Sequence, residues 1–302
     1  MSKAIVVSGL VKRYLEVEAV RKISFSVESG TLFAFLGPNG AGKSTTINII
    51  TTLLSFNEGE VHVNGYLVGK EDALIRDQIG IVFQDSVLDP YLSIRENLET
   101  RGSLYGTPKA ELTLAIDEAL EVTQIKDIQH RRYGKLSGGQ RRRADIARAL
   151  VHKPKILFLD EPTTGLDPQT RQSVWSTIQT LQKKTGMTVF LTTHYLEEAD
   201  QADDVVILDN GQIVAQGTPS FIKDHYSHDL LELKPSDFEK VLSQIEGLDY
   251  QIKGDLITIP IENTMKSLEI LPRVQDHIVS FQVKNGSLDD AFITITGKEM
   301  RS

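Results

Sequence analysis

A glycine-rich loop early in the chain has the composition and spacing to bind phosphate. Residues 37–44 read Gly-Pro-Asn-Gly-Ala-Gly-Lys-Ser, between an apolar run at 32–36 and a helical pattern over 43–54. Such glycines let successive N–H groups face an anion, while Lys43 can reach the β- and γ-phosphates and Ser44 can bind Mg²⁺. A plain glycine-rich turn is the alternative, and the strand–loop–helix context disfavours it. The positions expected to contact the nucleotide are Gly37, Pro38, Asn39, Gly40, Ala41, Gly42, Lys43, Ser44 and Thr45.

Two adjacent carboxylates follow a second apolar run. Residues 156–159 read Ile-Leu-Phe-Leu and lead into Asp160 and Glu161. Asp160, at the end of the expected strand, can hold Mg²⁺, and Glu161 is the better candidate to polarise an attacking water. A lone Asp-Glu often only ends a strand in a polar turn. The phosphate loop upstream favours the catalytic interpretation.

A third element, Leu136-Ser-Gly-Gly-Gln140, precedes a helical run that reaches Leu150. Ser137 suits an N-cap, and the bare backbone of Gly138 and Gly139 permits close approach. A helix N-terminus also attracts phosphate through its free N–H groups and its dipole. Taken alone, an ordinary capped helix start is the more frequent interpretation, but the other two motifs reverse that preference. The neighbouring arginines 141–143 span less than one helical turn and suit a solvated surface better than a nucleic-acid face.

Four further residues are candidates for the nucleotide site, although each of them, considered alone, would be interpreted as structural. Gln84 follows the strand expected at 79–83, and its amide can bind Mg²⁺ or orient water. His194 ends the strand expected at 188–192, where a structural histidine is the usual interpretation. Asp167 lies just beyond Glu161, where a turn opening a helix is the alternative. Tyr14 offers an aromatic face for adenine, although a core or surface tyrosine is the ordinary interpretation of such a residue.

Composition narrows the class of protein. The chain has 302 residues, of which 40% are hydrophobic, and a net charge of −8, which argues against a nucleic-acid partner. The absence of cysteine excludes disulfides, thiolate metal sites and a cysteine nucleophile. No segment has the roughly 20 apolar residues of a membrane helix, so we expect a soluble chain whose membrane role comes through a partner.

The order of the expected elements predicts two domains. Strands alternate with helices up to about residue 219, which predicts an α/β sheet with covered faces, and Asn64-Gly65 predicts a hairpin. Beyond that point the order is β-α-β-β-α-β, which suggests a ferredoxin-like α+β unit. We therefore expect a nucleotide-binding domain over 1–225 and an accessory domain over 226–302. For the accessory domain, a stabilising role and a regulatory or dimer-contact role are equally consistent with the sequence.

Together these motifs resemble those of ATP-binding-cassette (ABC) ATPases over about residues 3–225, in the family's order. The resemblance implies a P-loop NTPase core with an antiparallel β subdomain and a helical subdomain. It implies ATP and Mg²⁺ as cofactors, with Gln84 as the nucleotide-sensing glutamine, His194 on the γ-phosphate and Tyr14 on adenine. The implied catalytic residues are Glu161, His194, Lys43 and Gln84. The implied metal ligands are Ser44, Gln84 and Asp160, and the implied nucleotide contacts further include Ser137, Gly138, Gly139, Gln140 and Asp167.

The resemblance also implies partners. In this family two cassettes pair head to tail, so each ATP would lie between the phosphate loop of one copy and the Ser137 element of the other. Two copies would serve membrane permease subunits at the inner face of the cell membrane, through the segment that follows Gln84 and includes residues 91–98. The tail from Ser287 to Glu299 resembles that of multidrug and antibiotic-resistance exporter ATPases, which implies export of drugs, antibiotics or lipid-like compounds. The alternative is a soluble ABC-type ATPase that acts in assembly or nucleic-acid maintenance without transport.

Overall fold

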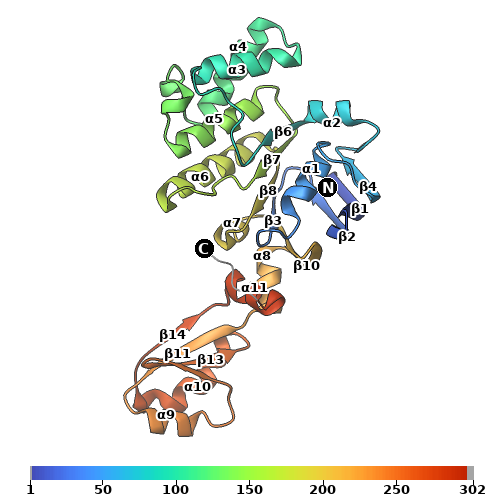
Figure 1. Ribbon diagram of the computed structural model, residues 1–302. Coiled ribbons are helices and arrows are strands. Elements are labelled where there is room, and N and C mark those ends of the chain that lie inside the picture. Colours follow the sequence, from blue (N-terminus) through green and yellow to red (C-terminus); the bar gives the residue numbers. More distant parts are fainter. Residues whose placement is uncertain (1, 298–302) are drawn as a thin grey trace. The chain divides into compact units, whose positions relative to one another are not determined.

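The computed structural model describes residues 2–297 and divides into two compact units, one up to Gly217 and one from Thr218 onward (Figure 1). The helix α8 (Pro219–Tyr226) belongs to the second unit, because it packs against α11 (Leu288–Thr296). The sequence-based boundary at 225 instead assigns this helix to the first domain. Lys298 and Glu299, which are part of the exporter-like tail, lie outside the described residues.

The centre of the first unit is a six-stranded sheet in the order β10-β9-β3-β8-β7-β6. Its strands are parallel except for β10, which pairs with β9 in the opposite direction. Parallel strands place all their carboxyl ends at one edge, where the loops that follow them meet. The strands are β3 (Leu32–Leu36), β6 (Ile79–Val82), β7 (Ile156–Asp160), β8 (Thr188–Thr193), β9 (Asp204–Asp209) and β10 (Gln212–Gly217).

An antiparallel sheet, β2-β1-β4-β5, packs beside the central sheet and confirms the predicted hairpin. Asn64 and Gly65 have φ angles of 49° and 86°, as the two-residue turn between paired Val63 and Tyr66 requires. The two sheets share a phenylalanine core, in which Phe25 stacks on Phe33 with ring centroids 5.7 Å apart. The strands are β1 (Lys3–Tyr14), β2 (Val17–Glu28), β4 (Glu58–Val63) and β5 (Tyr66–Leu67).

Helices cover the central sheet and form a separate helical part of the first unit (Figure 1). Helix α1 contacts β2 and β4, and α5 packs on α4, α6 and β6. The short helices α2 and α7 were not expected from the sequence, because four to seven residues are too few to show helical periodicity. The helices are α1 (Lys43–Ile50), α2 (Asp72–Gln78), α3 (Ile94–Gly102), α4 (Lys109–Val122), α5 (Gly138–Leu150), α6 (Pro168–Thr185) and α7 (Leu196–Ala199).

The second unit has an antiparallel sheet in the order β12-β13-β11-β14 and the β-α-β-β-α-β succession expected from the sequence. Leu231 and Leu233 on the central strand β11 are fully buried in its hydrophobic core. Its elements are β11 (Asp229–Pro235), α9 (Phe238–Gln244), β12 (Gln251–Lys253), β13 (Leu256–Ile261), α10 (Ser267–Val274) and β14 (Ile278–Lys284). In neither unit does a helix of residues 2–297 have the length and apolar character needed to cross a membrane.

Candidate active site

The phosphate loop connects β3 to α1 and depends on its glycines. Gly40 and Gly42 have φ angles of 81° and 105°, in the left-handed region that favours glycine. A Cβ on Gly37 would lie 2.3 Å from the carbonyl oxygen of Leu208, so no larger residue fits there. Helix α1 begins at Lys43, and among the described residues no side chain caps it, because its N-cap residue is Gly42. The N–H groups of its first turn are therefore available to an anion.

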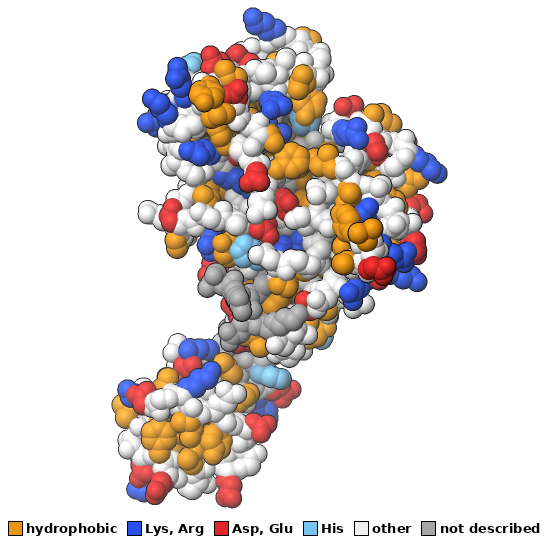
Figure 2. All heavy atoms as spheres, viewed as in Figure 1, with side chains coloured by type: hydrophobic (Ala, Val, Ile, Leu, Met, Phe, Trp, Pro, Cys, Tyr) orange, Lys and Arg blue, Asp and Glu red, His pale blue; other side chains and the backbone are white. Residues whose placement is uncertain are grey.

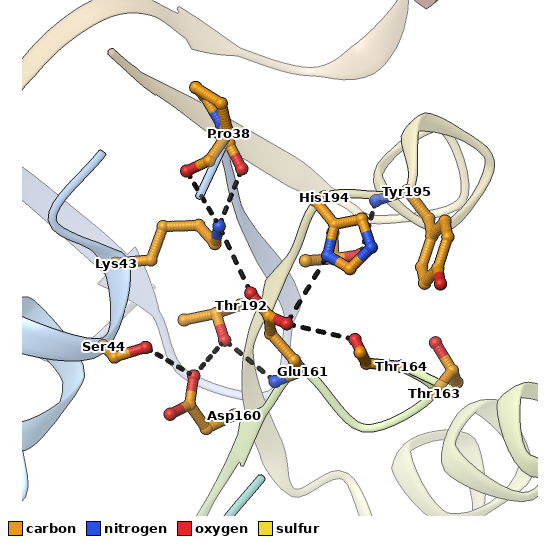
Figure 3. A network of polar contacts seen from close by, with 12 residues as sticks. Pro38, Lys43, Ser44, Asp160, Glu161, Thr163, Thr164, Thr192, His194 and Tyr195 are labelled. Carbon is orange, nitrogen blue, oxygen red and sulfur yellow. Dashed lines mark hydrogen bonds and ion pairs between the residues drawn. The ribbon is translucent and has the colours of Figure 1, made fainter. Parts of the chain in front are cut away.

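Lys43 reaches back from α1 across this loop. Its Nζ donates to the carbonyl oxygens of Gly37, at 2.7 Å, and Pro38, at 3.2 Å. It also lies 3.3 Å from Oε1 of Glu161, and the two side chains are only 4% and 9% exposed. Burial lowers the pKa of Lys43, while Glu161 opposes that shift. The structure therefore brings the expected phosphate-binding lysine and the expected catalytic carboxylate into direct contact (Figure 3).

Asp160 and Ser44 meet at the adjacent strand end. The parallel register of β7 and β8 sets Asp160 opposite Thr192, whose Oγ1 donates to Asp160 Oδ1 at 2.6 Å. The same Thr192 oxygen accepts the backbone N–H of Glu161 at 3.0 Å. Ser44 Oγ donates to Asp160 Oδ1 at 3.3 Å (Figure 3). A hydroxyl and a carboxylate this close are the oxygen ligands that Mg²⁺ prefers.

Glu161 is held as a carboxylate by its neighbours. His194 Nδ1 lies 3.5 Å from Oε2, and Thr164 Oγ1 donates to the same oxygen at 3.1 Å. The closeness of His194, with the charge of Lys43, lowers the pKa of Glu161 to about 2 although burial opposes the shift. At neutral pH this group is therefore fully ionised and is suited to orienting a water molecule.

The backbone at Glu161 is in an unusual conformation. Its φ of 45° lies in the left-handed region, which costs a non-glycine residue about 1–2 kcal/mol. Such strain persists only where surrounding contacts fix it, and it is common at functional sites. Here the loop after Glu161 is tied down by Thr163, which donates to the buried carboxylate of Glu198 on α7. No sequence signal distinguishes Glu198 from its exposed neighbour Glu197, so only the fold identifies this support.

The Ser137 element starts α5 as a capped helix. Ser137 Oγ accepts the N–H of Gln140 at 3.4 Å, and Gln140 Oε1 accepts the N–H of Ser137 at 3.1 Å, a reciprocal capping box. A Cβ on Gly139 would lie 2.4 Å from Cγ2 of Thr170, so glycine is needed where α5 meets α6. Ser137 and Gly138 are exposed. The predicted N-cap is confirmed, and its outward face remains accessible to another molecule.

Asp167 caps the next helix and lies beside the same element. Its Oδ1 accepts the N–H of Thr170 at 3.0 Å, and its hydrogen bonds with Thr170 lower its pKa. Pro168 follows as the first residue of α6, as the turn interpretation expects. A Cβ on Gly138 would lie 3.0 Å from Leu166 Cδ2, so the segment before Asp167 closely approaches α5.

Two expected site residues lie apart from these contacts. Gln84 is exposed two residues after β6 and lines a cavity of about 160 Å³ with Gly138 and Pro162. No hydrogen bond joins it to Ser44 or Asp160 within residues 2–297. Tyr14 is 45% exposed at the end of β1 and has Lys12 Nζ 5.0 Å from its ring centroid. In the described part of the chain no ring contact or hydrogen bond links Tyr14 to the phosphate loop.

The shifted pKa of Glu161 predicts a specific loss of stability in acid. Because its folded pKa of about 2 lies below the ordinary 4.5, it stabilises the fold above pH 4.5, and that contribution disappears as pH falls toward 2. The difference corresponds to about 3 kcal/mol. Acidification from pH 5 to pH 2 should therefore lower the free energy of unfolding of the unmodified chain, and it should lower that of Glu161→Gln less. The difference between the two decreases should be about 3 kcal/mol.

The chain's single tryptophan, Trp175 on α6, reports unfolding of the first unit by fluorescence in denaturant titrations. Glu197→Gln, the same change at an exposed site, should leave the acid limb unchanged. If the free energy of unfolding decreases with falling pH by the same amount in the unmodified chain and in Glu161→Gln, the lowered pKa of Glu161 is contradicted.

This chain is therefore a P-loop ATPase, with paired carboxylates at a strand end and a helical part that carries a second glycine-rich element. The family model for ABC transporters matches residues 20–164. The chain belongs to this family, as an ATP-binding subunit.

Relatives and solved structures agree with this assignment. The daunorubicin resistance ATP-binding protein DrrA3 of Streptomyces coeruleorubidus is 35% identical over 99% of this chain and 97% of the relative. The linearmycin resistance ATP-binding protein LnrL of Bacillus subtilis is 36% identical over 96% of this chain and 97% of the relative. Among solved structures, cbiO1 of Clostridium perfringens, part of an ABC transporter complex, has a TM-score of 0.70 at 29% identity and covers 74% of this chain and 92% of its own. A dimeric ATP-binding cassette bound to ADP and Pi has a TM-score of 0.64 at 29% identity, covering 71% and 98%.

The function follows from the family and the site together. The chain is the ATP-hydrolysing subunit of an ABC transporter of the drug-exporter subfamily, and it supplies the energy for transport.

Proposed function

We propose that this chain drives the export of an amphipathic drug, antibiotic or lipid-like compound through a separate membrane permease. The support is a similarity to resistance proteins that runs over 96–99% of the chain and so includes the second unit. A further relative of this extent is a Nod factor export ATP-binding protein of Ralstonia nicotianae, 33% identical over 98% of the chain. All three names describe removal of a compound from the cell or resistance to it.

The observation that carries the proposed mechanism is the contact network around Glu161. Lys43 would exchange its contact with Glu161 for the β- and γ-phosphates of ATP, because a phosphate offers more negative charge than one carboxylate. Glu161 would then orient the attacking water, and His194 would contact the γ-phosphate. Mg²⁺, held by Ser44 and Asp160 with Gln84, would neutralise charge on the phosphates.

Each site would be completed by a second copy of the chain. The exposed start of α5 offers the Ser137 hydroxyl, the N–H group of Gly138 and the helix dipole, but within the described residues Lys43 and Glu161 do not contact it. A homodimer arranged head to tail would place this element on the ATP of the other copy. Tyr14, half exposed at the end of β1, would stack on the adenine of its own ATP.

The surface after Gln84 suits the permease. Within the segment 91–98 the Tyr91 side chain is 80% exposed, whereas Asn97 and Leu98 are buried. The Asn97 amide fixes the loop through Asp89, so Tyr91 is presented on a rigid support. Leu104, just beyond α3, is also 76% exposed, and Figure 2 shows hydrophobic side chains at the surface in the region of α3 and α4. This surface would hold the chain at the inner face of the membrane.

Co-purification from detergent-solubilised membranes tests the transport role. The chain should co-purify with a polytopic membrane protein, and Tyr91→Asp should lower the recovered partner about ten-fold or more, because a buried interface tyrosine commonly contributes over 1.4 kcal/mol. Binding of a fluorescent ATP analogue by the purified variant should be unchanged.

Leu268→Asp is the matched control, because Leu268 is 59% exposed on α10 of the second unit and belongs neither to the loop after Gln84 nor to α3 and α4. Recovery of the chain with no membrane protein would instead favour an ABC-type ATPase acting in assembly without transport. An unchanged yield of partner with Tyr91→Asp would remove this residue from the contact.

A further inference from the structure

A buried arginine on α5 forms hydrogen bonds to the backbone on both sides of the catalytic carboxylate. Arg142 is 7% exposed and lies five residues after the Ser137 cap. Its Nε donates to the carbonyl oxygen of Pro162 at 2.6 Å, and its Nη2 donates to those of Asp160 at 3.0 Å and Glu161 at 2.9 Å. One guanidinium therefore binds three consecutive carbonyl groups centred on Glu161.

The same guanidinium reaches the loop after β6. Its Nη1 donates to the carbonyl oxygen of Phe83 at 2.5 Å, in the peptide that precedes Gln84. Four of the five N–H groups of Arg142 are thus engaged, and every acceptor lies at the end of β7 or in the loops after β6 and β7, next to expected catalytic residues. A lysine could not replace this arrangement, because its single nitrogen cannot span two loops.

A second side chain of α5 fixes the loop after β6 independently. Asp145 is 5% exposed, and its Oδ1 accepts a hydrogen bond from Ser86 Oγ at 2.6 Å. Its Oδ2 accepts from the hydroxyl of Tyr133, just before the Ser137 element, at 3.1 Å. Helix α5 therefore holds the loops after β6 and β7 at two points, one helical turn apart.

These contacts account for the conformation of Glu161. Its left-handed φ of 45° requires external support, and Arg142 binds the carbonyl oxygens immediately before, at and after that residue. A displacement of α5 would move Arg142 and with it the direction of the Glu161 side chain.

We propose that Arg142 is a positioning residue through which the orientation of α5, set at its Ser137 end by the ATP of the second copy, determines the position of Glu161 at the chain's own ATP. The inference rests on the proposed head-to-tail arrangement. The contacts of Arg142 would couple the two ATP sites of a dimer through one chain. A copy whose Ser137 element binds the ATP of its partner would thereby align its own Glu161.

Full-length Arg142→Gln tests this role. Hydrolysis of ATP should fall about 10²-fold, because a displacement near 1 Å of a reacting group has an effect of that size. Binding of a fluorescent ATP analogue and ATP-dependent dimerisation, followed by size-exclusion chromatography, should stay within about two-fold, since the phosphate loop and Ser137 are untouched. If Arg142→Gln folds poorly, Arg142→Lys serves as the second variant, because it keeps the positive charge but loses the forked guanidinium. It should likewise lose hydrolysis and keep ATP binding and dimerisation.

Arg148→Gln is the matched control, since Arg148 lies on the same helix and donates to the carbonyl oxygen of Ile81 within β6. The control should keep most of its hydrolysis at the temperature where both variants are folded. Equal loss of hydrolysis in the two arginine variants, or loss of dimerisation in proportion to hydrolysis, would overturn the positioning role. Failure of the unmodified chain to dimerise with ATP would count against the head-to-tail arrangement, and the drop in hydrolysis at unchanged ATP binding would still decide whether Arg142 positions Glu161.

Discussion

Glu161→Gln should lower the rate of ATP hydrolysis by about 10³-fold while ATP still binds, so that ATP-bound dimers accumulate. The change removes the negative charge that would orient the water, but it keeps the shape of a side chain that is 9% exposed. Lys43, now without its carboxylate partner at 3.3 Å, is freer to engage the phosphates. Binding should therefore be preserved or strengthened as hydrolysis is lost.

Two measurements check this expectation. Phosphate release gives the rate, and size-exclusion chromatography with ATP gives the fraction of dimer, which should rise in the variant. Glu197→Gln provides the matched exposed substitution and should behave as the unmodified chain does. Normal turnover by Glu161→Gln would remove Glu161 from the catalytic role.

A mixture of Lys43→Ala and Ser137→Arg chains should recover activity that neither variant has alone. In a head-to-tail dimer of the two, both defects fall in one site, and the other site combines an intact phosphate loop with an intact Ser137 element. Half of randomly formed dimers are mixed, and each has one of two sites intact, so the mixture should reach about a quarter of the unmodified activity. Each variant alone should fall to background.

The physical reason is the accessibility of the two ends of the site. Lys43 is 4% exposed and would act within its own chain, whereas Ser137 is exposed and a long cation there would obstruct an incoming copy. Dimers carrying one copy of each variant, isolated with two affinity tags, should reach about half of the unmodified activity. A mixture as inactive as both parents would contradict the shared site.

Much of the fold could be predicted from the sequence, because its signals are local. The strand at 32–36, the loop at 37–44 and the start of α1 follow from neighbouring residues alone, as does the Asn64-Gly65 hairpin. The N-cap at Ser137 and the proline that opens α6 are equally local signals. Helices as short as α7 have no such signal and depend on the packing of the finished fold.

Residue types and their spacing along the chain are enough to indicate the chemistry: a phosphate loop, two strand-end carboxylates, a second glycine-rich helix start and a histidine after a strand. How these groups contact one another depends on the packing of the folded chain. The register of β7 and β8 sets Thr192 between Asp160 and Glu161, and the packing of α5 directs Arg142 onto the carbonyls around Glu161. Contacts between residues distant in the chain depend on strand order, register and the direction of each side chain, and none of these is encoded in spacing along the chain.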